Sequence, residues 1–266
     1  MMKKKVLLIG LDGVRPDAVL VAKTPTLKGL AKEGLYSWHA QTEIHTISGP
    51  AWTSLLTGVH ADKHRVFDND FKPRDLKYRT FFSIAKDWNP QLRVVAHSHW
   101  KPILTEIFEK KVLSKKSSGP DKLMAWRMAK SIQKDEGDLY FIQLDDCDHA
   151  GHQYVYSPTS VKYLDQLAVT DTHVAQLMAA VRSRPSDEDW LICVVSDHGG
   201  EGKSLGMPAM GALTIIFIIV GNWLTARGEI PGREEEAPQI VDMVPTLAKF
   251  LGMPPDSAWD GTARGI

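Results

Sequence analysis

Five short apolar runs, separated by stretches with helical periodicity, set the strongest limit on how this chain can fold. They cover residues 6–11, 92–96, 139–144, 191–195 and 214–220. The run at 191–195 reads Leu-Ile-Cys-Val-Val without a polar break, which is typical of a central parallel strand covered on both faces. Strands that alternate with helices indicate an α/β fold. We therefore expect a single domain over residues 1–266, with a mostly parallel central sheet flanked by helices.

Signals for helix starts and ends lie between these runs. The Thr24-Pro25 pair predicts a helix start, with Gly34 at its end. The Ser157-Pro158 pair predicts a second helix that continues to about residue 181, and a last helix is expected over residues 241–251. The Lys- and Ser-rich stretch 110–122 is interpreted as a solvated loop or a helix end.

Composition excludes several classes of protein. The chain has 266 residues, and its 32 Lys+Arg balance its 32 Asp+Glu, so binding to a nucleic-acid duplex is not expected. Two cysteines are too few for a disulfide framework and are interpreted as buried thiols. The apolar run after the N-terminal lysines is too short for a signal peptide, and no run is long enough to span a membrane. A cytoplasmic location is therefore expected, although a trimmed export signal stays compatible with the sequence.

Acids and histidines follow three of the predicted strands. Asp12 follows the first run, Asp148 and His152 follow the third, and Asp197 and His198 follow the fourth. Because ligands bind at the carboxyl ends of parallel strands, these side chains are expected to meet in one crevice. Carboxylate oxygen and imidazole nitrogen suit zinc, with manganese as the next candidate. One such aspartate alone would more simply cap a helix, but five groups at three strand ends favour a metal site.

Ser48 is the candidate nucleophile. It precedes a predicted helix, whose N-terminal N–H groups and positive dipole end favour an anion. A serine hydroxyl is a weak nucleophile at neutral pH, and coordination by a divalent cation would activate it. The local sequence is equally compatible with a simple helix N-cap at Ser48.

Together these motifs resemble the alkaline phosphatase superfamily, and most closely its nucleotide pyrophosphatase/phosphodiesterase branch. In chain order they are Leu11-Asp12-Gly13, Ser48 with Leu56-Thr57-Gly58, His64-Arg65-Val66-Phe67-Asp68-Asn69, Asp148-His149-Ala150-Gly151-His152, Ser196-Asp197-His198-Gly199 and Asp242-Met243-Val244-Pro245-Thr246. The resemblance covers essentially the whole chain.

The resemblance implies two zinc ions that act on a small phosphate ester or a nucleotide. One ion would be held by Asp12, Asp197, His198 and the Ser48 oxygen, and the other by Asp148 and His152. Ser48 would form a covalent phosphoserine, and Asn69 would donate to a phosphoryl oxygen. Apart from the resemblance, Trp100 follows the 92–96 run and is a candidate for stacking on a base or sugar, with core packing as the alternative.

One departure from the family weakens the second metal site. The family has a histidine ligand shortly after its Asp-His-Gly motif, but this chain has Leu205 there and no histidine beyond His198. Weak occupancy is therefore expected, and reduced activity or a pseudoenzyme that only binds phosphate esters stays an alternative. A phosphomonoesterase is another. Sulfatase activity is disfavoured because Trp52 stands where that branch has arginine. The sequence does not indicate an oligomeric state.

Overall fold

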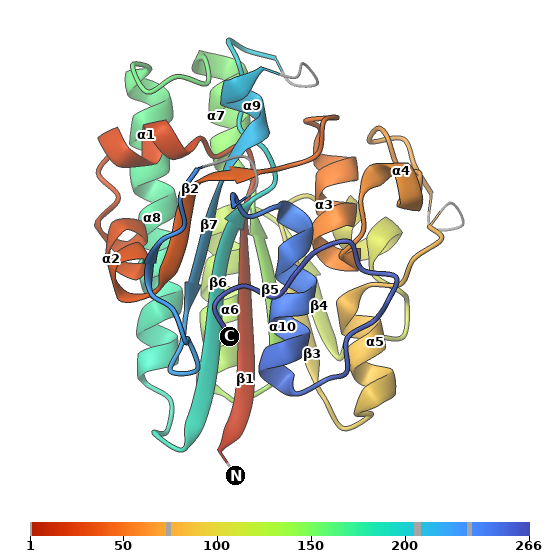
Figure 1. The fold of residues 1–266 in the computed structure, drawn as a ribbon. Coiled ribbons are helices and arrows are strands. Elements are labelled where there is room, and N and C mark those ends of the chain that lie inside the picture. Colours follow the sequence, from red (N-terminus) through yellow and green to blue (C-terminus); the bar gives the residue numbers. More distant parts are fainter. Residues whose placement is uncertain (1, 73–75, 205–208, 233–235) are drawn as a thin grey trace.

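The computed structural model describes residues 2–72, 76–204, 209–232 and 236–266. These residues form one eight-stranded mixed sheet in the order β4-β3-β5-β1-β6-β7-β2-β8, flanked by helices on both faces (Figure 1). The five strands from β4 to β6 run parallel, whereas β7 is antiparallel to both β6 and β2. The predicted α/β class is confirmed. The strands are β1 (Lys3–Leu11), β2 (Leu35–Gln41), β3 (Val94–Ser98), β4 (Lys115–Ser118), β5 (Leu139–Leu144), β6 (Glu188–Ser196), β7 (Thr214–Val220) and β8 (Gly228–Glu229).

Side chains of the central strands alternate between two hydrophobic cores, one on each face of the sheet. On β1, Val6 and Leu8 join the core under α3, α5 and α10, while Leu7 and Ile9 join the core under α2, α6 and α8. Burial on both faces explains why the strand sequences are almost wholly apolar. The helices are α1 (Pro16–Val21), α2 (Pro25–Glu33), α3 (Ser48–Thr57), α4 (Ala61–His64), α5 (Phe81–Trp88), η2 (Ile103–Ile107), α6 (Asp121–Gln133), α7 (Asp146–Tyr154), α8 (Val161–Arg182), α9 (Met210–Leu213), η3 (Ile240–Asp242) and α10 (Met243–Leu251).

The five predicted strands correspond to β1, β3, β5, β6 and β7. The bounds of β5 and β7 match the prediction, while β1 and β6 are longer and β3 lies two residues further along. Three edge or near-edge strands, β2, β4 and β8, were not predicted. The interpretation of residues 110–122 as loop or helix end was partly wrong, because β4 lies there and pairs with β3 alone. Its Lys-Lys-Ser-Ser sequence suits a solvent-facing edge strand.

The N-terminal caps of two predicted helices differ from the expected ones. The helix α2 has the predicted bounds, but the Thr24 side chain does not cap it; instead, the Asp171 carboxylate of α8 accepts from the N–H groups of Thr26 and Leu27. The prediction that Ser157 caps the long helix was wrong, because α8 begins at Val161 after an N-cap at Ser160. Among the described residues, no helix is both long enough and apolar enough to cross a membrane.

Candidate active site

Three loops meet at the carboxyl ends of the neighbouring central strands β5, β1 and β6 (Figure 1). This region, with the side chains of the three loops, is called the carboxyl edge below. Asp12 follows β1, Asp148 lies in α7 directly after β5, and Asp197 and His198 follow β6. The parallel register pairs the last residue of β1 with the last residues of both β5 and β6, so the three strands end level with one another. The structure thereby brings these four side chains together.

Gly13 sets the distance between the loops after β1 and β5. Its φ of 65° lies in the left-handed region, which favours glycine. A Cβ atom added there would lie 2.7 Å from the Cα of Asp148, so a side chain at position 13 would push α7 away from the edge. The Gly13 N–H also donates to Asp197 Oδ1 at 3.1 Å, which ties the first loop to the loop after β6.

Asp12 is held by two donors from the core. Trp52 Nε1 of α3 and Gln143 Nε2 of β5 donate to its Oδ2 at 3.0 and 2.9 Å. Gly10 makes room for the indole, since a Cβ atom at position 10 would lie 2.4 Å from it. The other oxygen, Oδ1, is buried and has no hydrogen-bond partner among the described residues. One side of the carboxylate is therefore fixed, and the other lies 3.5 Å from His198 Nε2.

In its neutral form, His198 directs the lone pair of Nε2 into the same space. Its Nδ1 lies 2.8 Å from the carbonyl oxygen of Gly199. A carbonyl only accepts, so Nδ1 carries the proton and Nε2 has a free lone pair in the neutral ring. Nε2 is 3.3 Å from Asp197 Oδ2, which is buried and, within the described part of the chain, lacks a hydrogen bond. Two carboxylate oxygens and an imidazole lone pair, all acceptors, therefore face one another.

This set of acceptors fits a divalent cation. Carboxylate oxygen and neutral imidazole nitrogen are zinc ligands. Donor atoms of Asp12, Asp148 and His198 lie within 4.8 Å of one another, so this group joins Asp148 of the second predicted set to two ligands of the first, while Asp197 contacts His198 at 3.3 Å. Burying acceptors face to face without a positive partner is costly, and a cation between them would offset that cost. The residues of the edge therefore fit the metal that the family resemblance implies.

The electrostatics of the edge agree with this assignment. Burial raises the pKa of Asp12 well above its usual value, and the charges of Asp197, Asp145 and Asp148 raise it further. Burial also raises the pKa of Asp197, and although His198 opposes this rise, the Asp148 charge adds to it. Acids perturbed in this way are typical of functional sites, and a cation bound between them would favour their ionised forms.

Asp148 and His152 lie one turn apart on α7. His152 Nε2 is 3.5 Å from Asp148 Oδ2, and the His152 Nδ1 is 3.0 Å from the carbonyl oxygen of Lys203, which again leaves Nε2 unprotonated in the neutral ring. Asp148 is buried and its carboxylate accepts from the Tyr156 hydroxyl. The His152 side chain is 44% exposed, so it lies at the solvent rim of the edge. Leu205, which was predicted to stand in place of a third ligand, lies outside the described residues.

Ser48 faces the metal-ligand candidates from the start of α3. The alternative that it is a simple N-cap is wrong, since the N-cap is Ile47 and the Ser48 Oγ lies 3.2 Å from His198 Nε2. The next residue, Gly49, donates its N–H to Asn69 Oδ1 at 2.7 Å. This bond keeps Asn69 beside the serine and leaves the amide NH₂ of Asn69 as the group that can donate to a ligand.

Sequence reasoning missed the residues that support the edge: Trp52, Gln143, Asp145 and Tyr156. Gln143 is the central one, because its Nε2 donates to both Asp12 Oδ2 and Asp145 Oδ1. A glutamine inside the apolar run Leu-Tyr-Phe-Ile-Gln-Leu was an available signal, since a buried amide needs polar partners. The contacts made by Trp52 and Tyr156 depend on the tertiary fold and carry no such mark in the sequence.

Trp100 lies in the turn after β3. Its side chain is partly buried against the core, and its backbone N–H donates to Gln143 Oε1 at 2.9 Å. This bond connects the Trp100 turn to the amide that holds Asp12. Stacking of Trp100 on a substrate stays a prediction.

The α/β fold and the acids and histidines at the carboxyl ends of its central strands are those of an alkaline phosphatase-like protein. The model of the type I phosphodiesterase / nucleotide pyrophosphatase family matches residues 6–118 and 84–204. The chain belongs to this family.

Two curated relatives illustrate the range of the match. The ectonucleotide pyrophosphatase/phosphodiesterase family member 7 of Rattus norvegicus is 23% identical over 225 residues, which cover 73% of this chain and 49% of the relative. The GPI ethanolamine phosphate transferase 1 of Candida glabrata is 34% identical over 242 residues, which cover 74% of this chain and 24% of the relative. The chain thus spans about half the length of the first relative and about a quarter of the second.

Solved structures show the same fold at low sequence identity. A murine ectonucleotide pyrophosphatase/phosphodiesterase 5, an inactive variant in complex with AMP, has a TM-score of 0.78 and 14% identity, with 94% of this chain and 96% of that chain covered. A 2-O GAG sulfatase has a TM-score of 0.77 and 13% identity, with 98% of this chain and 73% of that chain covered.

Proposed function

We propose that this chain hydrolyses phosphodiester or pyrophosphate bonds of small molecules through a covalent phosphoserine at Ser48. Family membership supports the class of reaction. The observation that carries the proposal is the contact between Ser48 Oγ and His198 Nε2, next to the unpaired oxygens of Asp12 and Asp197. A hydroxyl in that position shares its surroundings with the groups best suited to hold a cation.

The metal set follows from the same residues. Asp12, Ser48, Asp197 and His198 would hold one divalent ion, zinc before manganese, and Asp148 and His152 would hold a second one more weakly. Ions bound there supply positive charge that lowers the pKa of the serine hydroxyl and stabilises the oxygen of the leaving group.

The chain itself supplies the nucleophile and the orientation of the substrate. Ser48 Oγ attacks phosphorus and loses its proton to water, and the P–O bond to the leaving group breaks as the Oγ–P bond forms. The amide NH₂ of Asn69 donates to a non-bridging oxygen of the transferred phosphoryl group. A water molecule then attacks the phosphoserine, the Oγ–P bond breaks, and Ser48 is regenerated.

Nucleotides are the first substrates to test, because the murine structural neighbour is in complex with AMP. Trp100 would stack on the base or sugar of such a ligand. Its turn is connected through Gln143 to Asp12, which supports a position near the reacting phosphoryl group.

The decisive experiment compares Ser48→Ala with Ser157→Ala, a matched change on the loop before α8. With zinc-loaded protein, we expect bis-p-nitrophenyl phosphate to be cleaved faster than p-nitrophenyl phosphate. Ser48→Ala should lower this activity to background and remove the covalent adduct that acid quenching traps for mass spectrometry, a Ser48 phosphoryl group that still carries one p-nitrophenyl ester, while Ser157→Ala should keep both. Full activity in Ser48→Ala would exclude the serine mechanism. A preference for the monoester would favour a phosphomonoesterase.

Leu205→His tests the alternative of a pseudoenzyme. If the missing histidine limits the second metal, this change should tighten zinc binding at Asp148 and His152 and raise the rate. A chain that binds phosphate esters but turns over none of them, either as wild type or as Leu205→His, would be a binding protein rather than an enzyme.

Transfer to an alcohol is a second candidate function, because the relative at 34% identity is a phosphate transferase. The same phosphoserine could be attacked by an acceptor hydroxyl in place of water. Adding ethanolamine or glycerol to the assay distinguishes the two, since transfer from a diester produces a new phosphodiester of the added alcohol and hydrolysis produces a phosphate monoester.

A further inference from the structure

A second group of potential metal ligands lies beside the candidate active site and outside the family's metal set. It consists of His99, which follows β3, and of Asp146 and His149 of α7. One donor atom from each lies within 4.8 Å of the other two. The three side chains are 22%, 34% and 60% exposed, so a hydrated ion can reach them from solvent.

Asp121 holds the His99 ring through Nδ1, which also lies 3.4 Å from Asp146 Oδ1, so the free Nε2 shares an ion with Asp146 only when the Asp146 side chain turns toward it. Asp121, fully buried at the start of α6, accepts from His99 Nδ1 at 2.8 Å and from the backbone N–H groups of Asp145 and Asp146 at 2.8 and 2.9 Å. The Asp121 carboxylate only accepts, so His99 Nδ1 carries the proton and Nε2 keeps its lone pair in the neutral ring. Metal-binding histidines have this arrangement, in which a carboxylate fixes the ring and its tautomer.

His149 completes the group from the next turn of α7. Its Nε2 lies 3.1 Å from Asp145 Oδ2, and its ring is nearly perpendicular to that of His99, with ring centroids 5.2 Å apart. Asp145 is in turn joined to Asp12 through Gln143 Nε2, which donates to both carboxylates. The group therefore lies next to the candidate active site, but its potential metal ligands are different residues.

Among the described residues, the carboxylates around this group have only histidines as ion-pair partners. Asp121, Asp145 and Asp146 lie next to one another, and their basic partners within the described part of the chain are the rings of His99 and His149. No lysine or arginine among the described residues forms a salt bridge with these three carboxylates. These two rings compensate the carboxylates only when they are protonated, whereas a divalent cation would compensate them with both rings neutral.

We propose that His99, Asp146 and His149 bind one Zn²⁺ ion, separate from the two ions of the family's active site. Two imidazoles and one carboxylate are a zinc ligand set that leaves a coordination position for water or an anion. Asp121 and Asp145 support the two histidines from behind. The site does not depend on Ser48 chemistry, so it can exist whether or not the chain turns over phosphate esters.

The test counts zinc rather than activity. Metal-free protein is titrated with Zn²⁺ alone, bound metal is counted by mass spectrometry after gel filtration, and affinity is measured by calorimetry. His149→Ala and Asp146→Asn should each lose one equivalent of zinc, with affinity at that site at least about a hundredfold weaker, because losing only a supporting residue already costs 10–100-fold. His39→Ala is the matched control, since its side chain is similarly exposed and lies on β2.

The same titration in an Asp12→Asn background separates this site from the active site. There, His149→Ala should still remove one equivalent of zinc, and with Co²⁺ in place of zinc it should lower the visible absorption by the share of one bound ion. Unchanged zinc counts and affinities in both single variants would overturn the proposal. So would complete loss of zinc from Asp12→Asn alone, because the group would then not bind by itself. Unfolding of the metal-free variants by urea verifies that none of the changes disrupts the fold.

Discussion

The carboxylates at the two ends of the central strands differ in their ion-pair partners. At the amino end, Asp135 and Asp138 form ion pairs with Lys3, Lys5 and Arg93. At the carboxyl end, Asp12, Asp148 and Asp197 have only histidines as salt-bridge partners within the described residues. The carboxylates at the amino end therefore have lysine and arginine partners, whereas those at the carboxyl end have none among the described residues.

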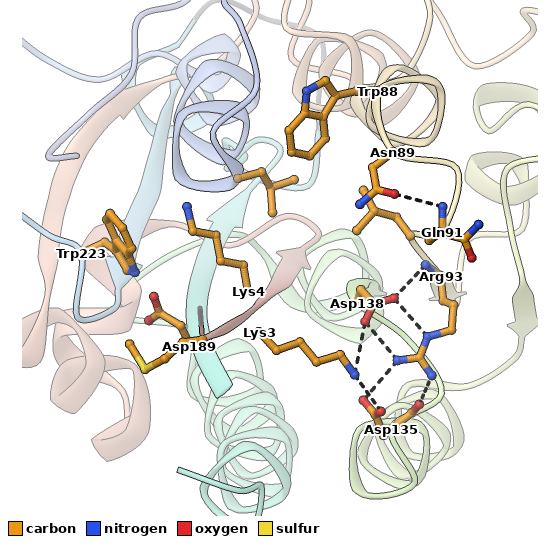
Figure 2. A pocket seen from close by; sticks show the side chains of 13 residues that line it. Lys3, Lys4, Trp88, Asn89, Gln91, Arg93, Asp135, Asp138, Asp189 and Trp223 are labelled. Atoms are coloured by element: carbon orange, nitrogen blue, oxygen red, sulfur yellow. Dashed lines mark hydrogen bonds and ion pairs between the residues drawn. The ribbon is translucent and has the colours of Figure 1, made fainter. Parts of the chain in front are cut away.

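Figure 2 shows the amino end, where a pocket of about 660 Å³ lies beside these ion pairs. Lys5 is fully buried, and its Nζ contacts Asp135 and Asp138 at 2.6 and 2.8 Å. Burial raises the pKa of Asp138, but the bonds from Arg93 and Lys5 outweigh it and lower this pKa to about 2. The pKa of Asp12 shifts upward instead. Buried acids with partners from the chain stabilise a fold, while buried acids without them point to an added cation.

The largest change in stability is expected from Asp138→Asn. The asparagine would leave the buried Lys5 ammonium with one carboxylate fewer, and breaking a buried ion pair costs about 3 kcal/mol or more. Equilibrium unfolding in urea measures this loss. The control is Asp87→Asn, which removes an exposed pair with Arg79 and should change stability little. An equally small loss for both variants would show that the amino-end network is not structural.

Asp12→Asn should have the reverse effect on stability together with a large loss of function. Its amide oxygen can keep the bonds from Trp52 and Gln143, while its NH₂ replaces the unpaired Oδ1 and can donate to His198 Nε2. We expect diesterase activity at least about a hundredfold lower, since changes to residues that merely support a metal ligand already reach that size.

The metal-free Asp12→Asn protein should be more stable than wild type by about 1 kcal/mol, because a buried acceptor gains a partner. Unfolding in the presence of a chelator measures this gain. A variant that is both active and less stable would contradict the contrast between the two ends. Asp62→Asn, an exposed change on α4, controls for general effects of removing an acid.

The contrast also explains which parts of the fold were predictable from the sequence. The strands β5 and β7 are apolar except for Gln143 and Thr214, and their bounds were predicted correctly because strands buried on both faces consist almost wholly of apolar residues. The strand β4 consists of two lysines and two serines, so only its pairing with β3 defines it. Strands with mostly buried, apolar side chains can therefore be predicted from the sequence. Strands that are defined only by pairing with a neighbouring strand cannot.

The residues of the candidate site likewise divide into those predictable from the local sequence and those that depend on tertiary contacts. Asp12 and Asp197 were predictable because each directly follows a recognisable strand in the sequence. Asp145 and Gln143 matter through bonds that cross from β5 to Asp12, and such bonds depend on register between strands. His99 contacts Asp121 at a distance of 22 residues along the chain, and no local pattern predicts that contact.

Acid should remove the contribution of the amino-end ion pairs. The folded pKa of Asp138, about 2, is below the ordinary value of 3.8, so its ionised form stabilises the fold above that ordinary value. This stabilisation is lost as pH falls toward the folded pKa. Between pH 4 and pH 2, wild type should lose up to about 2 kcal/mol more than Asp138→Asn, so their stabilities converge. Urea unfolding curves recorded at each pH test this; a constant difference between the two proteins would contradict it.

The smallest expected effect concerns Asp189, an exception at the amino end. Both of its carboxylate oxygens are buried and, among the described residues, lack a hydrogen bond. Burial raises its pKa, although the charge of Lys4 opposes the rise. Asp189→Asn keeps the shape and removes the buried charge, so it should stabilise the protein at pH 7 by about 1 kcal/mol.

Asp187→Asn, an exposed neighbour, is the control for Asp189→Asn and should leave stability unchanged. Asp189 also sharpens the comparison between the two ends. Like Asp12, it is buried and forms no salt bridge with a lysine or arginine among the described residues, but unlike Asp12 it has no histidine within salt-bridge distance there. Zinc should therefore not protect it: the gain from Asp189→Asn should be the same with and without zinc. A gain that zinc abolishes would show that an unpaired buried acid alone is enough to bind metal in this chain.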